Sequence, residues 1–161
     1  MNIYEENQFF RQWFIWVPLI IFAVCLGGYL GRKGYLFMTV ENQSPIVGLA
    51  MILGGLVPFA IMALLYFSGL HVRVADGSLE YKFTPFTSLT TIPLSKIESA
   101  EVIEFSPMKD FGGWGVRVGK LGRALIISGN RGVKVSIDGG EVIILGSKTP
   151  EELATAINQT N

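Results

Sequence analysis

The chain has 161 residues, of which 50% are hydrophobic, and it carries 13 basic and 13 acidic side chains for a formal net charge of zero. Its mean hydropathy of +0.44 is high for a soluble domain of this length. The balanced charge lacks the basic excess of a nucleic-acid-binding domain, so we expect no nucleic-acid partner. A single cysteine, Cys25, and a single histidine, His71, exclude an intramolecular disulfide and a metal site built from several His and Cys ligands.

Residues 1–12 form a polar segment that ends in aromatic side chains. Glu5 and Glu6 stand where a secretory signal would carry basic residues, so we expect the following apolar stretch to be retained rather than cleaved. An aromatic cluster runs from Phe9 to Trp16, and such rings favour the headgroup layer of a membrane. We therefore expect residues 1–12 to be an N-terminal interfacial segment.

Two uncharged apolar stretches follow, at about residues 13–31 and 46–70. A helix of roughly 20 apolar residues crosses a bilayer, so each stretch is long enough to be a transmembrane span. Together they predict a transmembrane hairpin over residues 13–70, closed by a short polar loop containing Arg32, Lys33 and Glu41. The basic residues near the membrane ends favour an inner or plasma membrane with both termini cytoplasmic. Because neither span contains an ionisable residue, we interpret the hairpin as an anchor and not as a transport pathway.

Small residues recur along both spans. Ala23, Gly27 and Gly31 are four residues apart in the first span, as are Ala50 and Gly54 in the second. Such faces let helices approach closely. They indicate packing within the hairpin, which we favour because the loop is short, or a homo-oligomer formed through the small-residue faces.

From His71 onward the hydrophobic pattern changes to a period of two, which is typical of β-strands. Apolar residues alternate on both sides of Asp76-Gly77, a pair that favours a type I′ hairpin turn. A two-residue turn predicts that Val74 faces Leu79 and that Val72 faces Tyr81. Further short strands are expected at residues 91–94, 100–105, 114–118, 124–128, 133–137 and 142–145. We therefore predict seven or more antiparallel strands.

The last element is predicted to be a short amphipathic helix over residues 150–158. Thr149 is the expected N-cap, Pro150 takes the first helical position, and Glu152 lies three residues after the cap, as in a capping box. Leu153 and Ile157 fall on one face, so we expect this helix to close an open end of the sheet.

Several antiparallel strands followed by one C-terminal helix resemble the layout of a pleckstrin-homology-like (PH-like) barrel or sandwich. Three stretches also resemble small bacterial membrane proteins that carry such a domain after two spans: T-I-P-L-S-K-I at 91–97, G-G-W-G-V-R at 112–117 and I-L-G-S-K-T-P-E-E-L at 144–153. The resemblance implies an α+β membrane protein with a PH-like β domain over residues 71–161. It implies no particular activity and transfers no site residues.

The candidate ligand-binding residues come from an uneven distribution of charge. Between Asp110 and Asp138 every charged side chain is basic, and the aromatic Trp114 lies among glycines at the start of this basic run. A tethered domain can turn such cations toward anionic headgroups, although strand alternation can equally scatter them around the fold. The candidates are Trp114, Arg117, Lys120, Arg123, Arg131 and Lys134, of which we expect Lys120 and Arg131 to lie in turns.

We expect a membrane-anchored, non-enzymatic module that binds or scaffolds a protein partner, in the membrane or the cytoplasm, or anionic lipid headgroups. An accessory subunit of a membrane complex or transporter is the alternative. A hydrolase using the acidic segment 98–110 is less favoured, because paired carboxylates are the only catalytic groups the domain offers. We predict no catalytic residues, no bound metal and no cofactor.

Overall fold

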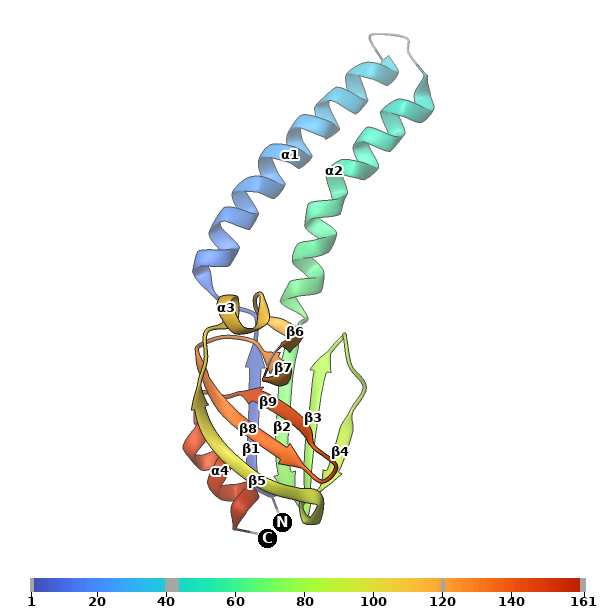
Figure 1. The fold of residues 1–161 in the computed structure, drawn as a ribbon. Coiled ribbons are helices and arrows are strands. Elements are labelled where there is room, and N and C mark those ends of the chain that lie inside the picture. The colour runs from blue at the N-terminus through green and yellow to red at the C-terminus, as the bar shows by residue number, and fades with distance from the viewer. Residues whose placement is uncertain (1, 40–43, 120, 160–161) are drawn as a thin grey trace. The chain divides into compact units, whose positions relative to one another are not determined.

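The computed structural model of the protein describes residues 2–39, 44–119 and 121–159. These residues form two compact units (Figure 1). One unit is a pair of helices between Arg11 and Tyr66, and the other combines the described residues before Arg11 with those after Tyr66. The described strands all belong to the second unit, which we call the β unit, so the chain has an α+β fold.

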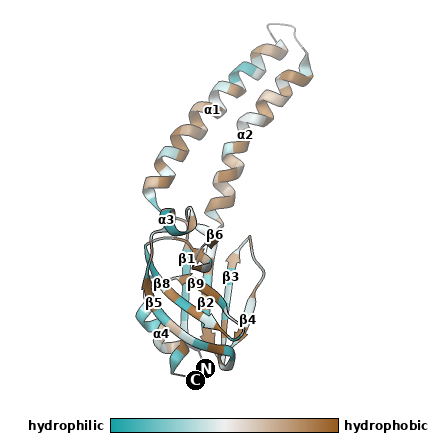
Figure 2. Ribbon diagram, in the orientation of Figure 1, coloured by the Kyte–Doolittle hydropathy of each residue, from teal (hydrophilic) through white to brown (hydrophobic). Residues whose placement is uncertain are grey.

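The helical unit consists of α1 (Trp13–Thr39) and α2 (Pro45–Tyr66). At 27 and 22 residues they are about 40 and 33 Å long, which is enough to cross a membrane. Only 6% and 17% of their most apolar stretches are buried, so neither is a core helix of the protein. Figure 2 shows apolar residues along both helices.

The helix ends differ from the expected spans. Helix α1 continues through Arg32 and Lys33, which are good helix formers, instead of ending at Gly31. Helix α2 ends at Tyr66, four residues early, because Gly69 and Leu70 already belong to a strand. Glu41, the acidic residue expected in the connecting loop, lies outside the described residues.

The two helices pack through glycines, mostly not those the spacing indicated. A Cβ atom added at Gly27 would lie 2.9 Å from the carbonyl oxygen of Gly55, and one at Gly34 would lie 2.5 Å from that of Gly48. Ala23 is also fully buried. A Cβ added at Gly31, in contrast, would meet no atom of another described segment within 4 Å. Ala23 and Gly27 therefore serve packing within the hairpin.

The β unit begins with a strand where we expected an interfacial segment. Strand β1 (Asn2–Phe9) is antiparallel to β2 (Gly69–Ala75) along its length, so the helical pair is inserted between two hydrogen-bonded neighbours. Tyr4 and Gln8 are buried, whereas Glu5 and Asn7 are exposed. This alternation was hidden in the sequence because the inward positions include the polar residues Glu6 and Gln8.

The first sheet has the order β1-β2-β3-β4, with β3 (Ser78–Thr84) and β4 (Thr90–Pro93). The predicted hairpin register is confirmed, because Val74 pairs with Leu79 and Val72 with Tyr81. Asp76 and Gly77 have φ values of 50° and 74°, as a type I′ turn requires. Arg73 and Glu80, which pair across the strands, lie 3.8 Å apart as an ion pair.

The second sheet has the order β5-β8-β9-β7-β6. A 3-10 helix, η1 (Leu94–Lys96), leads into it, and a short helix, α3 (Pro107–Phe111), follows β5. The five strands are β5 (Ile97–Glu104), β6 (Gly115–Gly119), β7 (Gly122–Ile126), β8 (Arg131–Ile137) and β9 (Glu141–Gly146).

This topology corrects the expected antiparallel arrangement and distinguishes between the expected barrel and sandwich. Strands β7 and β9 are parallel, so the fold is not wholly antiparallel. The reason is that β9, antiparallel to β8, returns on the side nearer β7 and inserts between these two strands. The described strands also form two separate sheets that enclose one core, as in a sandwich, and not a closed barrel.

The predicted C-terminal helix is confirmed with its bounds, as α4 (Pro150–Asn158). Leu153 and Ile157 are fully buried in the core between the sheets, and α4 packs against β1, β2, β5 and β8. The predicted capping box is wrong, because the Thr149 side chain makes no capping bond. Its hydroxyl instead lies 3.0 Å from the hydroxyl of Tyr4.

Candidate functional site

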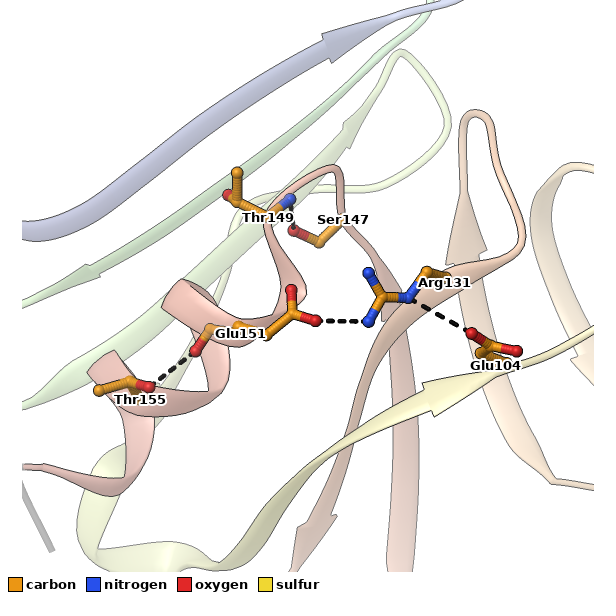
Figure 3. Close-up of polar contacts among 6 residues, drawn as sticks. All are labelled: Glu104, Arg131, Ser147, Thr149, Glu151 and Thr155. Carbon is orange, nitrogen blue, oxygen red and sulfur yellow. Dashed lines mark hydrogen bonds and ion pairs between the residues drawn. The ribbon is translucent and has the colours of Figure 1, made fainter.

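The predicted basic run does not form one surface, and Arg131 is the clearest departure. It begins strand β8 rather than lying in a turn. Its guanidinium contacts Glu151 on α4, and its Nε lies 3.6 Å from a carboxylate oxygen of Glu104 on β5 (Figure 3). Arg131 therefore joins two strands to the C-terminal helix, and its charge is already compensated.

The carboxylate of Glu151 responds to these contacts. A hydrogen bond from its own backbone amide, followed by the contact with Arg131, lowers the pKa of Glu151 below its ordinary value. Thr155, one turn further along α4, donates to the Glu151 carbonyl at 2.7 Å (Figure 3). These interactions fix the first turn of the helix, so we assign Arg131 a structural role in place of the expected ligand-binding one.

Arg117 and Lys134 point to the face of the second sheet that turns away from the main core. They occupy one row across the sheet with Ala124, Ile144 and Glu101. Ala124 and Ile144 belong to a small second core on this face. The Nε of Arg117 donates to the Trp114 carbonyl at 3.0 Å.

Trp114 is part of the same second core. Its ring is partly buried and packs against a cluster of Phe105, Phe111, Ala124, Ile126 and Ile144. Phe105 and Phe111 meet edge to face with ring centroids 5.8 Å apart. Trp114 therefore covers the second sheet, a packing role rather than that of an open aromatic platform.

Arg123 lies on the opposite face of the sheet from Arg117 and Lys134. Its row contains Ile143, Val135 and Ala100, all of which belong to the core between the two sheets. Because neighbouring residues of a strand point to opposite faces, Arg123 points toward the first sheet. Lys120, the remaining candidate, lies outside the described residues.

Arg123 lines a groove of about 270 Å³ at the side of the sandwich where β4 faces β7 and β9. Lys96, at the end of η1, lines the same groove, together with Tyr81, Thr90, Thr91 and Glu141. The backbone carbonyl of Lys96 accepts a hydrogen bond from the Asp138 amide at 2.9 Å, which holds this segment against the β8–β9 turn. The groove thus brings together two cations that are 27 positions apart in sequence.

Tyr81 forms the inner wall of this groove and is 2% exposed. Burial raises the pKa of its phenol, while a hydrogen bond with Thr90 and the charge of Arg123 act in the opposite direction. Burial is the largest effect, so the hydroxyl stays protonated at neutral pH and keeps its hydrogen-bond donor.

A second polar cluster joins the N-terminal strand to the β9–α4 junction. The Tyr4 hydroxyl donates to a carboxylate oxygen of Glu6 at 2.6 Å, and the Ser147 hydroxyl donates to the same oxygen at 2.6 Å. The Lys148 amide donates to the other Glu6 oxygen at 2.9 Å. Burial, and then Glu6, raise the pKa of Tyr4 to about 12. Each of these groups already has a partner, which indicates a structural role.

A groove of about 390 Å³ beside this cluster is lined by Tyr4, Glu151 and Glu152. Its two carboxylates disfavour an anionic ligand, so it does not match the expected chemistry. Within the described ranges no group of three or more His, Cys, Asp or Glu side chains could hold a metal ion.

The acidic segment 98–110 is dispersed in the structure. Glu98, Glu101 and Glu104 are spaced three residues apart along β5, which is about 10 Å per step, and Glu101 and Glu104 point to opposite faces. Glu104 contacts Arg131, and Asp110 accepts a hydrogen bond from the Ser106 amide at 2.6 Å. This spacing does not provide the convergent carboxylate pair that a hydrolase requires.

Sequence reasoning found Arg123 but missed Lys96, Tyr81, Thr90 and Glu141. Lys96 stands outside the basic run, and its local pattern gives no sign that β4 faces β7 across the sandwich. Comparison with protein-family models and with curated proteins finds no match to this chain.

Proposed function

We propose that the protein is an integral membrane protein in which the helical pair anchors a binding module, the β unit, at one membrane face. The observation that carries this proposal is the insertion of α1 and α2 between the paired strands β1 and β2. Only residues 10–12 and 67–68 connect the helices to these strands, so the β unit would remain close to the bilayer.

The exposed apolar side chains of the helices support membrane insertion. Trp13 and Ile46, near the first residues of the two helices, are 76% and 78% exposed. Phe22, further along α1, is also more than half exposed. Exposing this much apolar surface to water is unfavourable, whereas lipid would cover it. We propose the orientation expected from the sequence, with both termini cytoplasmic in a bacterial inner or plasma membrane.

We also propose that the β unit is a divergent PH-like domain. Two packed sheets and a C-terminal helix docked on the core support this proposal. The parallel pair β7 and β9 is a departure from the antiparallel arrangement that we expected, and β1 precedes the helical pair.

The activity we propose is non-enzymatic recognition of an anionic ligand or partner by the β unit. Lys96 and Arg123, two cations that line one groove of the β unit, are the residues that support it. Such contacts are individually weak, but tethering raises the effective concentration of a ligand at the membrane surface.

An accessory subunit or homo-oligomer remains a second candidate, which one observation favours. Among the described residues, Cβ atoms added at Gly28 and Gly31 would meet nothing within 4 Å, so α1 keeps a small-residue face beyond its contact with α2. Such a face suits close approach by another transmembrane helix. Crosslinking of the full chain in membranes distinguishes a second copy from a different partner.

The proposed function is tested with the full chain in nanodiscs of neutral phosphatidylcholine. These nanodiscs should capture vesicles that contain anionic lipid better than neutral vesicles, and the difference should shrink as salt screens the charges. Resistance to alkaline extraction from membranes is the companion test of the anchor. Equal capture of both kinds of vesicle would overturn anionic recognition, and extraction of the chain at alkaline pH would overturn the anchor.

A further inference from the structure

We propose that the groove between β4 and the β7–β9 pair is a binding site for a phosphate group, with Lys96 and Arg123 as its cationic ligands. This inference rests on the proposed function, because it assigns anionic recognition to one place in the β unit. The groove holds about 270 Å³, which is room for a phosphate and part of the molecule that carries it.

The lack of an ion-pair partner at Arg123 indicates that the groove can bind an anion. Among the described residues, Arg73 and Arg131 form ion pairs with Glu80, Glu104 and Glu151, whereas Arg123 and Lys96 form none. Arg123 is nevertheless partly buried and points toward the core side of the sheet. A partly buried guanidinium that makes no ion pair is costly, and an anion in the groove would compensate it.

Hydrogen-bond donors beside the two cations indicate a phosphate rather than a bare halide. Tyr81 and Thr90 line the groove, and their hydroxyls share a hydrogen bond, which leaves one hydroxyl hydrogen of the pair for a ligand. A phosphate presents several acceptor oxygens, and a guanidinium can bind two of them in parallel. The two cations and the Tyr81–Thr90 hydroxyl pair therefore match the acceptors of one phosphate group.

Among the residues that the structure describes, Glu141 is the one acidic side chain that lines the groove. It lies on β9, two residues before Ile143, which pairs with Arg123. Its carboxylate would repel a phosphate, so with Lys96 and Arg123 the groove retains a single positive charge. Removing this negative charge in Glu141→Gln should therefore strengthen phosphate binding, whereas removing a cation should weaken it.

The test measures how fast the Lys96 amine is acetylated in the full chain, held in neutral phosphatidylcholine nanodiscs and analysed by mass spectrometry. Inorganic phosphate is the first probe, and nanodiscs in which part of the lipid is phosphatidic acid are the second. At nine times the Kd about one tenth of the sites are free, so acetylation of Lys96 should slow about tenfold. Lys134, on the other face of the sheet, is the internal control and should react at an unchanged rate.

Substitutions then test whether the protection of Lys96 arises from binding in the groove. Arg123→Gln should raise the probe concentration needed to protect Lys96 by at least about tenfold, because it removes a charge-assisted contact. Arg117→Gln, a matched change on the opposite face, should leave protection unaltered. Glu141→Gln should lower the phosphate concentration required, a gain that a misfolded protein could not produce. Circular dichroism of Arg123→Gln verifies that its sheets are intact.

The outcomes distinguish a soluble phosphate from a lipid headgroup, or they contradict binding in the groove. Protection by inorganic phosphate in neutral nanodiscs supports a soluble phosphate ligand, and protection only with phosphatidic acid supports a lipid headgroup. No protection of Lys96 with either probe, or equal protection in Arg123→Gln and the wild type, would overturn the groove. If anionic vesicles are still captured in that case, the proposed function stands and only its location is wrong.

Discussion

The side-chain amide of Gln8 donates a hydrogen bond of 2.7 Å to the backbone carbonyl of Gly146, at a site where Gln8 is 1% exposed. This contact connects the first strand of the chain to the last strand before α4, across 138 positions of sequence. It lies between the two sheets and helps to hold β1 in the β unit.

Replacing Gln8 by alanine should therefore destabilise the β unit. The change removes a buried hydrogen bond and leaves the Gly146 carbonyl without it, which costs about 1–3 kcal/mol of unfolding free energy. Denaturation of the full chain in detergent, followed by circular dichroism of the sheets, measures the loss. Lys82→Ala, at an exposed position of β3, should change the unfolding free energy by no more than about 0.5 kcal/mol. Equal effects of both changes would contradict a specific role for Gln8.

Tyr4 should make the stability of the β unit fall at high pH. Its pKa is raised from 10.0 to about 12, so the folded protein keeps a proton that the unfolded chain loses. The stabilisation is complete below pH 10 and is lost as the pH rises toward 12, by roughly 2–3 kcal/mol at 1.36 kcal/mol per pKa unit. Tyr4→Phe should show a smaller decline over this window when unfolding is measured at several pH values. An identical decline in both proteins would show that Tyr4 is not its source.

The docking of α4 should depend on Leu153, which is fully buried. Leu153→Ala should cost about 2–5 kcal/mol of unfolding free energy, because it removes buried methyl groups and leaves a cavity. Glu152→Ala, at the adjacent exposed position, is the control and should have little effect. The same denaturation assay compares the two, and an unaltered midpoint for Leu153→Ala would mean that α4 does not stabilise the core.

Two glycines of α1 should respond to alanine with opposite signs. A Cβ at Gly34 would lie 2.5 Å from the Gly48 carbonyl oxygen, so Gly34→Ala should push the helices apart and lower the stability of the hairpin. A Cβ at Gly28 has open space, so Gly28→Ala should stabilise the helix by about 0.5–1 kcal/mol. Thermal unfolding in detergent, with spin-label distances between α1 and α2, measures both effects. A loss of stability in Gly28→Ala would indicate instead that another helix occupies that face.

Removing Arg131 should raise the pKa of Glu151 only in part. The largest cause of its lowered pKa is its own backbone amide, and Arg131 contributes second. Arg131→Gln should therefore move the pKa toward the ordinary value of 4.5 without reaching it, as measured by NMR titration of the full chain. Lys134→Gln, which removes a cation from the opposite face, should leave the Glu151 titration unaltered. A full return to 4.5 would show that the amide contact does not form.

Local patterns determined much of this architecture from sequence alone. The Asp76-Gly77 turn fixes the register of β2 and β3 because only residues tolerant of positive φ fit a type I′ turn. Pro150 and the spacing of Leu153 and Ile157 likewise determine α4, since the first-turn proline and the apolar face act within one helix. The two long apolar helices follow from composition and length.

Tertiary structure decided the features that depend on distant segments. Strand β1 forms because β2 offers it a ladder of hydrogen bonds, a partner that lies beyond the whole helical pair. Gly34 and Gly48 contact each other because of the way in which the helices cross, and the spacing of glycines in the sequence does not determine this pair.

The residues of the candidate site likewise depend partly on the sequence and partly on tertiary structure. The sequence identified a run of cations, but strand alternation and the insertion of β9 beside β7 placed Arg117 and Arg123 on opposite faces. Arg131 forms an ion pair with Glu151, and Arg123 lines the same groove as Lys96. Charge can be read from residue types, whereas the neighbours that compensate it or leave it free are set by long-range packing, which no local pattern encodes.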